Sequence, residues 1–184
     1  MQTLPRGPEG LNFNNMCRTL TAREFIQETL IKEFADIVNG EKEHNYISFL
    51  LISCGIEFLG KCMAPVGTDW HHRASEQYFK QGVSLFPDPY KQQDIDDVLY
   101  HGLRCGICHA LLPKNELIVS STEEQDLNGN PLHLNIHTFY NDFKQACTTL
   151  LENENYKARL EESFMATSEN SSGSPKTIKI VKQE

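Results

Sequence analysis

Apolar residues recur at helical spacing along most of the chain between residues 21 and 153. This periodicity predicts five helices, over residues 21–40, 46–60, 74–86, 92–113 and 136–151. Thr21 and Glu24 lie three positions apart at the start of the first segment and form a capping-box sequence, which marks a helix N-terminus. The second segment is apolar on nearly every side, with Glu57 as its one charge, so we expect a central helix packed on several faces. A carboxylate there is costly unless it is paired, so we expect Arg104 or a histidine as the partner of Glu57.

Two shorter segments, residues 117–119 and 132–134, have the composition typical of strands. An Asn-Gly-Asn-Pro stretch at residues 128–131 lies between them and favours a tight turn, so we expect a small β-hairpin. We therefore predict an all-α fold, an up-and-down bundle of four or five helices with a small β-hairpin inserted before the last helix.

The two ends of the chain differ from this helical region. Residues 1–20 contain two prolines and two glycines and are predicted to be a flexible N-terminal arm. Residues 154–184 are polar with little to bury, and are predicted to be a disordered tail. The folded domain is therefore expected over residues 21–153.

The chain carries 25 acidic and 17 basic residues, a net charge of −8, and its sequence pI is about 5.4. That balance argues against a broad electrostatic grip on nucleic acid, although it leaves room for a local basic site. The first residues lack the charged start and apolar core of a secretory signal, and no stretch approaches the length of a membrane span. Six irregularly spaced cysteines are then typical of reduced thiols, so we expect a cytoplasmic protein without membrane contact.

The predicted fourth helix carries the most concentrated chemistry, because residues 101–109 hold one arginine, two cysteines and two histidines. Its apolar residues fall on one stripe, made up of Leu99, Leu103, Ile107, Ala110 and Leu111. At about 100° per residue the reactive side chains lie elsewhere around the helix; these are His101, Arg104, Cys105, Cys108 and His109. We expect the stripe to pack against the domain and the other side to form a site.

Two metal-containing alternatives use the same segment. Cys105, Cys108 and His109 fit the C-x-x-C-H pattern of c-type haem attachment, in which the histidine is an axial iron ligand. Covalent haem attachment, however, normally takes place outside the cytoplasm. A zinc site would combine Cys105 and Cys108 with Cys54, Cys62 or a histidine. Structural zinc sites usually use two pairs of closely spaced ligands, and here only Cys105 and Cys108 have that spacing. We therefore expect a site with neither cofactor nor metal, and keep the haem protein as a less favoured alternative.

Arg104 and His109 are separated by four residues and resemble the R-x4-H signature of the HEPN superfamily, small helical-bundle proteins that include metal-independent ribonucleases. The LYHGLRCGICHALL segment, with a hairpin and a final helix after it, is also similar to a group of bacterial proteins with an arginine, a cysteine and a histidine in that arrangement. The resemblance covers about residues 21–153. The family usually has Asn, Asp or His directly after the arginine, where this chain has Cys105.

The resemblance implies a homodimer in which the arginine and histidine of two subunits meet in a cleft. Arg104 would hold the scissile phosphate of RNA, and His109 would transfer a proton to or from the reacting oxygens, without a metal. Glu57, His101 and Cys105 would support this site. The resemblance equally allows a non-catalytic dimerisation, ligand-binding or RNA-binding module. Both functions are compatible with an antitoxin or another protein as a binding partner. A nuclease needs Arg104 and His109 exposed in a cleft, whereas a scaffold would hold them in salt bridges.

Overall fold

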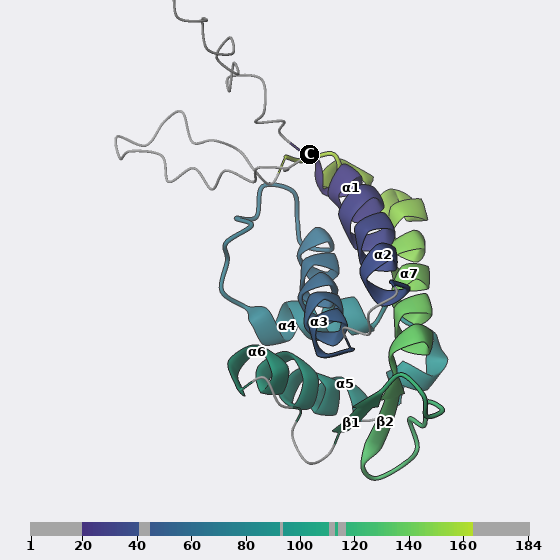
Figure 1. Cartoon of the computed structure of the whole chain (residues 1–184). Coiled ribbons are helices and arrows are strands. Elements are labelled where there is room, and N and C mark those ends of the chain that lie inside the picture. Colours follow the sequence, from purple (N-terminus) through teal and green to yellow (C-terminus); the bar gives the residue numbers. More distant parts are fainter. Residues whose placement is uncertain (1–19, 41–44, 93, 111–112, 114–116, 164–184) are drawn as a thin grey trace, which may run out of the picture.

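The computed structural model describes residues 20–40, 45–92, 94–110, 113 and 117–163. These residues are mainly helical and include one pair of short strands (Figure 1). Three long helices pack together, and these are a helix over residues 22–38, α3 (Asn45–Cys62) and α7 (Ile136–Glu152). The first of them consists of α1 (Ala22–Phe25), a π-helical segment (Ile26–Glu33) and α2 (Phe34–Val38). In Figure 1, α4 (Ser75–Val83) and a helix over residues 95–110 run across the lower part of these three. The predicted helical fold is confirmed.

The first helix begins where the sequence predicts. The Thr21 hydroxyl accepts a hydrogen bond from the Glu24 backbone N–H at 3.2 Å, and the Glu24 carboxylate accepts one from the Thr21 N–H at 3.1 Å. This capping box satisfies backbone donors that the first turn of a helix cannot pair internally. The buried face of the helix consists of Ala22, Ile26, Leu30 and Phe34.

Helix α3 is the central helix that its composition predicts, since it contacts α2, α4, α7 and the helix over residues 95–110. Its buried side chains include Phe49, Ile52, Ile56 and Leu59. A helix that is covered by neighbours on several sides needs apolar residues on all of those sides. Among the described residues, neither α3 nor any other helix is long and apolar enough to cross a membrane.

Two glycines allow α3 and α4 to cross with their backbones in contact. A Cβ atom added at Gly60 of α3 would lie 1.8 Å from the carbonyl oxygen of Tyr78, and one added at Gly82 of α4 would lie 2.0 Å from that of Ile56. Any larger residue would push the helices apart. This crossing fixes where the first turn of α4 lies relative to the second half of α3, which is where the candidate site forms.

The helix over residues 95–110 consists of α5 (Ile95–Val98), a π-helical segment (Leu99–Cys105) and α6 (Gly106–Ala110). Leu99, Leu103 and Ile107 are buried, as the apolar stripe predicts, whereas Leu111 and the Ala110 side chain lie outside the described residues. The π-helical turns are wider than α-helical ones and occur frequently at functional sites. They cover the part of the helix that carries His101, Arg104 and Cys105.

The predicted β-hairpin is wrong in its strand direction. Strands β1 (Leu117–Ser120) and β2 (Leu132–Asn135) lie where the sequence places them, but they pair in parallel. The tight turn instead closes between Asp126 and His133, whose backbone N–H and C=O groups exchange two hydrogen bonds of 2.9 Å. The chain therefore reverses once between β1 and Asp126 and again before β2, and this second reversal makes the two strands parallel.

The packed domain extends beyond the predicted boundary at residue 153. The 3₁₀ turn Glu154–Tyr156 and α8 (Lys157–Leu160) follow α7, and both Arg159 and Leu160 are buried. The Arg159 guanidinium lies 3.5 Å from the centre of the Trp70 ring, and residue 162 pairs with residue 22 through a backbone hydrogen bond of 3.1 Å. The segment 154–163 therefore belongs to the domain. Residues 1–19 and 164–184, the remainder of the predicted arm and tail, lie outside the described residues.

Candidate functional site

A polar cluster joins α3, α4 and the helix over residues 95–110. Its centre is Glu57, whose Oε2 atom accepts hydrogen bonds from the Ser75 hydroxyl at 2.7 Å and from Arg104 Nε at 3.0 Å. The other carboxylate oxygen, Oε1, lies 3.3 Å from Lys61 Nζ. We call Glu57, Lys61, Ser75 and Arg104 the Glu57 cluster.

The local fold brings these four side chains together. Glu57 and Lys61 are four positions apart on α3 and therefore share one face of that helix. Ser75 is the first residue of α4, and the close crossing at Gly60 and Gly82 places it against α3. Arg104 comes from the π-helical segment and reaches Glu57 on α3, against which this segment packs.

The charges around Glu57 favour its ionised form. Burial by itself raises the pKa of the carboxyl group, but hydrogen bonds from Ser75 and Arg104, together with the positive charges of Arg104 and Lys61, outweigh burial and hold the pKa below its ordinary value of 4.5. Two cations therefore surround one carboxylate. The cluster keeps a local positive excess in a chain whose net charge is −8.

A small pocket opens at this cluster. It has a volume of about 190 Å³ and is lined by Cys54, Glu57, Phe58, Lys61 and Arg104. The guanidinium of Arg104 and the ammonium of Lys61 are suited to binding an anion there, since a guanidinium matches the geometry of a phosphate and an ammonium adds charge. His109 lies five positions after Arg104, in α6, and its side chain is exposed.

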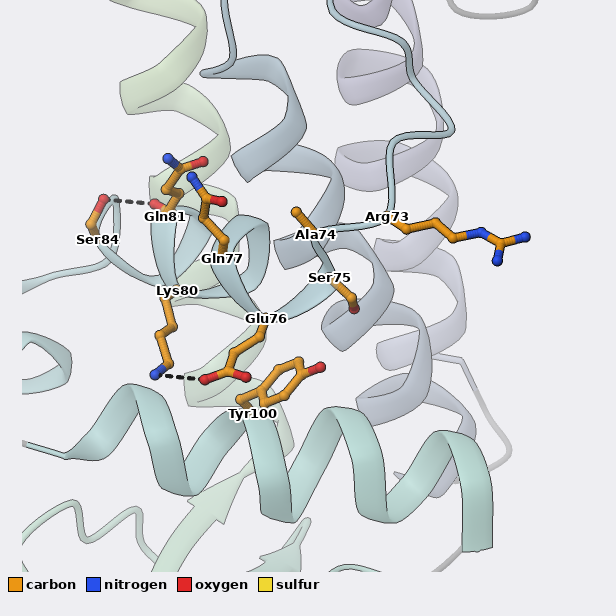
Figure 2. A pocket seen from close by; sticks show the side chains of 9 residues that line it. All are labelled: Arg73, Ala74, Ser75, Glu76, Gln77, Lys80, Gln81, Ser84 and Tyr100. Atoms are coloured by element: carbon orange, nitrogen blue, oxygen red, sulfur yellow. Dashed lines mark hydrogen bonds and ion pairs between the residues drawn. The ribbon is translucent and has the colours of Figure 1, made fainter.

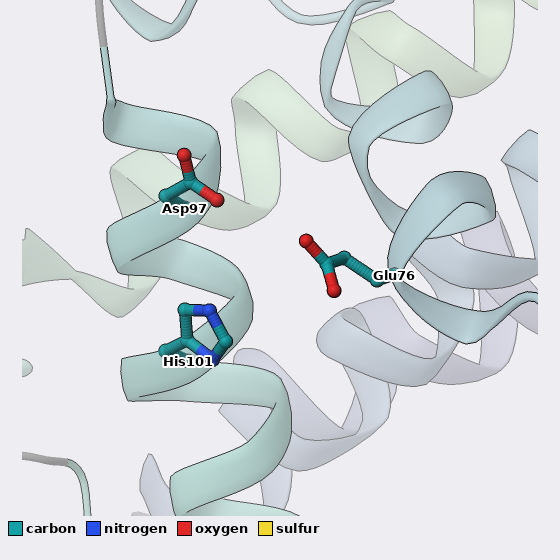
Figure 3. Close-up of side chains that lie close together, drawn as sticks. All are labelled: Glu76, Asp97 and His101. Atoms are coloured by element: carbon teal, nitrogen blue, oxygen red, sulfur yellow. The ribbon is translucent and has the colours of Figure 1, made fainter.

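A second polar cluster lies on the same helix, next to α4. Figure 3 shows the Glu76 carboxylate of α4 directed toward Asp97 and His101, with the three potential ligand atoms within 4.8 Å of one another. Two carboxylates and an imidazole are a ligand set that a divalent metal could use. Lys80 Nζ, however, lies 2.6 Å from Asp97 Oδ1 and 3.0 Å from Glu76 Oε1, so a lysine already supplies the cation. We call these four residues the Lys80 cluster.

Tyr100 lies between the two clusters. Its ring packs on Phe79 with a centroid distance of 5.6 Å, and its hydroxyl interacts with Ser75 and Cys105. Burial, followed by the effects of Cys105 and Glu76, raises the pKa of this phenol, and so the hydroxyl stays protonated. Figure 2 shows Tyr100 at the edge of a larger pocket of about 870 Å³, which is lined by Arg73, Ala74, Ser75, Glu76, Gln77, Lys80, Gln81, Ser84 and Tyr100.

The structure brings two of the five predicted site residues into direct contact. These are Arg104 and Glu57, the second of which was expected to need a charged partner inside the protein. His101 lies beside Glu76 and Asp97, and Cys105 is half-buried beside Tyr100.

Sequence reasoning missed Lys61, Ser75 and Tyr100. The spacing of Lys61, four positions after Glu57 on a predicted helix, was a usable signal. Ser75 and Tyr100 carried none, because their role depends on how α4 crosses α3 and on how the helix over residues 95–110 lies against α4.

The cysteines considered as metal or haem ligands differ in their surroundings. Cys54 is exposed, Cys62 is buried and Cys105 is half-buried, whereas the side chain of Cys108 lies outside the described residues. Burial strongly raises the pKa of the Cys62 thiol.

A scan against models of protein families, a search of curated proteins and a search of solved structures found no match to this chain. The arrangement offers an oriented guanidinium, an adjacent ammonium and an exposed imidazole further along the same helix. These groups are able to bind an anion and to transfer a proton.

Proposed function

We propose that this protein is a HEPN-like, metal-independent endoribonuclease that acts as a homodimer. The observation that carries the proposal is the position of Arg104, which Glu57 orients beside Lys61 at a small pocket, with His109 exposed on the same helix. The R-x4-H resemblance assigns the same two residues to catalysis. The finer description of the fold, an up-and-down bundle of four or five helices, is part of this proposal.

In the proposed reaction Arg104 and Lys61 bind the scissile phosphate and stabilise the negative charge that develops on its oxygens. His109 removes the proton from the ribose 2′-hydroxyl, whose oxygen attacks phosphorus and forms a bond to it. The bond from phosphorus to the 5′-oxygen breaks, and this oxygen takes up a proton from a second imidazole, which the partner subunit would supply. The products are a 2′,3′-cyclic phosphate and a free 5′-hydroxyl.

The charge distribution supports an anionic substrate bound locally. An acidic chain does not hold nucleic acid over a broad surface, but the Glu57 cluster has two cations for one carboxylate. Glu57 supports the reaction by fixing the Arg104 guanidinium, in the way that outer residues orient the groups that touch substrate. A cytoplasmic toxin or defence role, with an antitoxin or another protein as partner, is the setting we propose for such an activity.

One observation favours a second function. Arg104 is engaged in a salt bridge with Glu57, and its side chain is 22% exposed, as expected for a non-catalytic scaffold of the same fold. In that case the Glu57 cluster would join three helices, and the domain would serve as a dimerisation or ligand-binding module. The two functions differ in one respect, which is whether Arg104 and His109 are both required for cleavage of RNA.

The test is cleavage of a mixed RNA substrate by purified protein in excess EDTA, with its molar mass measured by light scattering. We expect cleavage by a dimer, and a loss of roughly 100-fold or more in His109→Ala, since general acid–base catalysis contributes that much. Arg104→Lys keeps the charge but not the planar fork and should lose most of the activity. His137→Ala is the matched control, because His137 is exposed on α7.

Cleavage that all three variants retain would assign the activity to a contaminant. A folded dimer that cleaves no RNA would reject the nuclease and leave the scaffold function. Cleavage that requires an added metal ion would contradict the proposed mechanism.

A further inference from the structure

The Lys80 cluster brings three potential metal ligands together from two helices. Asp97 and His101 lie four positions apart on the helix over residues 95–110 and therefore share one face of it. Glu76, in the first turn of α4, reaches toward both, so that one ligand atom from each of the three side chains lies within 4.8 Å of the others (Figure 3). This convergence depends on the packing of α4 against the other helix.

The cluster holds more negative than positive charge. Lys80 Nζ lies 2.6 Å from Asp97 Oδ1 and 3.0 Å from Glu76 Oε1, so a cation already occupies the position between the carboxylates. Hydrogen bonds to Asp97 and then to Glu76 raise the pKa of Lys80, because both carboxylates favour a positive charge there. One ammonium neutralises only one of the two negative charges, whereas a divalent ion at the same position would neutralise both.

The His101 imidazole is the member of the cluster that Lys80 does not engage. It is exposed, and within the described part of the chain its side chain makes no hydrogen bond or ion pair. Its ring lies edge-on to that of Tyr100, with a centroid distance of 5.2 Å, and Tyr100 in turn packs on Phe79. A neutral imidazole nitrogen carries a lone pair that a metal ion binds directly.

Zinc is the divalent ion that fits this set of ligands. Zn²⁺ binds carboxylate oxygens and imidazole nitrogens, and a site with three protein ligands keeps a fourth position for water. Bonds of about 2.0–2.2 Å place the ligand atoms of a tetrahedral ion roughly 3.4 Å apart. The present separations of up to 4.8 Å can therefore close by small rotations of the side chains. Mg²⁺ prefers oxygen ligands and loses its water molecules reluctantly, so an imidazole disfavours it.

From these observations we propose that the Lys80 cluster is a zinc site in which Zn²⁺ exchanges with the Lys80 ammonium. Glu76, Asp97 and His101 bind the ion, and water fills the fourth position. The displaced ammonium moves into the adjoining larger pocket, which Lys80 already lines. The bound ion connects α4 to the helix over residues 95–110. This inference goes beyond the proposed ribonuclease and gives the metal no part in the cleavage of RNA.

The experiment measures binding of Zn²⁺ to the purified, metal-free protein by isothermal titration calorimetry, together with the thermal midpoint of unfolding. We expect the midpoint of the wild type to rise with the concentration of Zn²⁺, because a ligand that binds the native state stabilises it. His101→Ala and Asp97→Asn should each weaken binding by about tenfold or more, since even the outer partners of a metal site contribute that much. Both substitutions should also abolish the rise in the midpoint.

Lys80→Met is the sharper test, because it should change the affinity in the opposite direction. The substitution removes the competing ammonium, so Zn²⁺ should bind about fivefold more tightly, a factor that matches the strength of an exposed ion pair. Zinc bound elsewhere on the chain would give the same signal in all of these variants. His137→Ala, which removes an exposed histidine of α7, is the matched control and should leave the affinity unchanged.

Equal affinities in the wild type, His101→Ala and Asp97→Asn would overturn the proposal. So would Mg²⁺ that binds as tightly as Zn²⁺ and stabilises His101→Ala equally, because carboxylate charge alone would then account for binding. Zinc binding by Lys80→Met but not by the wild type would mean that the lysine keeps its position, and would reject the exchange. None of these outcomes bears on the ribonuclease, which is tested separately in EDTA.

Discussion

The two ion-pair clusters on the helix over residues 95–110 use the same kinds of side chain but differ in burial and charge balance. In the Glu57 cluster one carboxylate, 13% exposed, is shared by Arg104 and Lys61, which are 22% and 21% exposed. In the Lys80 cluster one ammonium, 31% exposed, is shared by Glu76 and Asp97, which are 49% and 45% exposed. The first cluster has a surplus cation near the interior, and the second has a surplus carboxylate in solvent.

The difference in burial predicts a difference in what each cluster does. Exposed ion pairs contribute little to stability, because water and salt screen them and long side chains lose entropy when they pair. Removal of one member of a partly buried cluster leaves desolvated charges without a partner, which is costly. We therefore expect the Glu57 cluster to matter for folding and anion binding, and the Lys80 cluster to shape the surface charge.

The largest effect on stability should follow Glu57→Gln. The amide keeps the shape of the side chain but leaves Arg104 and Lys61 close together without a counter-charge. We expect the free energy of unfolding, measured by urea denaturation at neutral pH, to fall by about 2 kcal/mol. Asp97→Asn removes a carboxylate from the exposed cluster and is the matched control, with a much smaller expected change. Equal losses in the two variants would contradict the comparison.

The stabilities of the wild type and of Glu57→Gln should also depend differently on pH. The pKa of Glu57 is lowered on folding, so its ionised form stabilises the native state at pH values above the ordinary value of 4.5. This contribution is lost as the pH falls below 4.5 and through the folded-state pKa. The difference in unfolding free energy between the wild type and Glu57→Gln should therefore shrink on acidification. A difference that stays constant down to the acid transition would show that Glu57 acts through packing.

The sequence predicted the helices well because burial leaves a periodic record of apolar residues. Leu99, Leu103 and Ile107 mark the packed side of their helix without any knowledge of the partner. Strand direction leaves no such record, since it depends on the path between residues 120 and 132. The Asn-Gly turn was correctly recognised, but it closes Asp126 against His133 instead of joining β1 to β2.

The candidate site was predictable only in part, for a similar reason. A lone carboxylate in an apolar helix needs a cation, and Arg104 was one of the partners expected for Glu57. Ser75 joins the cluster because Gly60 and Gly82 let two helices touch, and a pair of glycines on different helices gives no signal in a single sequence. The dimer and the assignment of His109 stay predictions that the experiments above decide.

The smallest expected effect is that of Lys80→Met, and for this reason it tests the comparison most severely. Lys80 has short contacts with two carboxylates, so a count of contacts alone would rank it above Lys61. Screening by solvent predicts the opposite, namely an unfolding free energy that is unchanged within error. Any destabilisation at low ionic strength should disappear at about 1 M salt, where the screening length is roughly 3 Å. A loss that persists at high salt would mean that the Lys80 cluster holds α4 against its neighbour. Tyr100 and the pocket would then depend on that cluster as much as on Glu57.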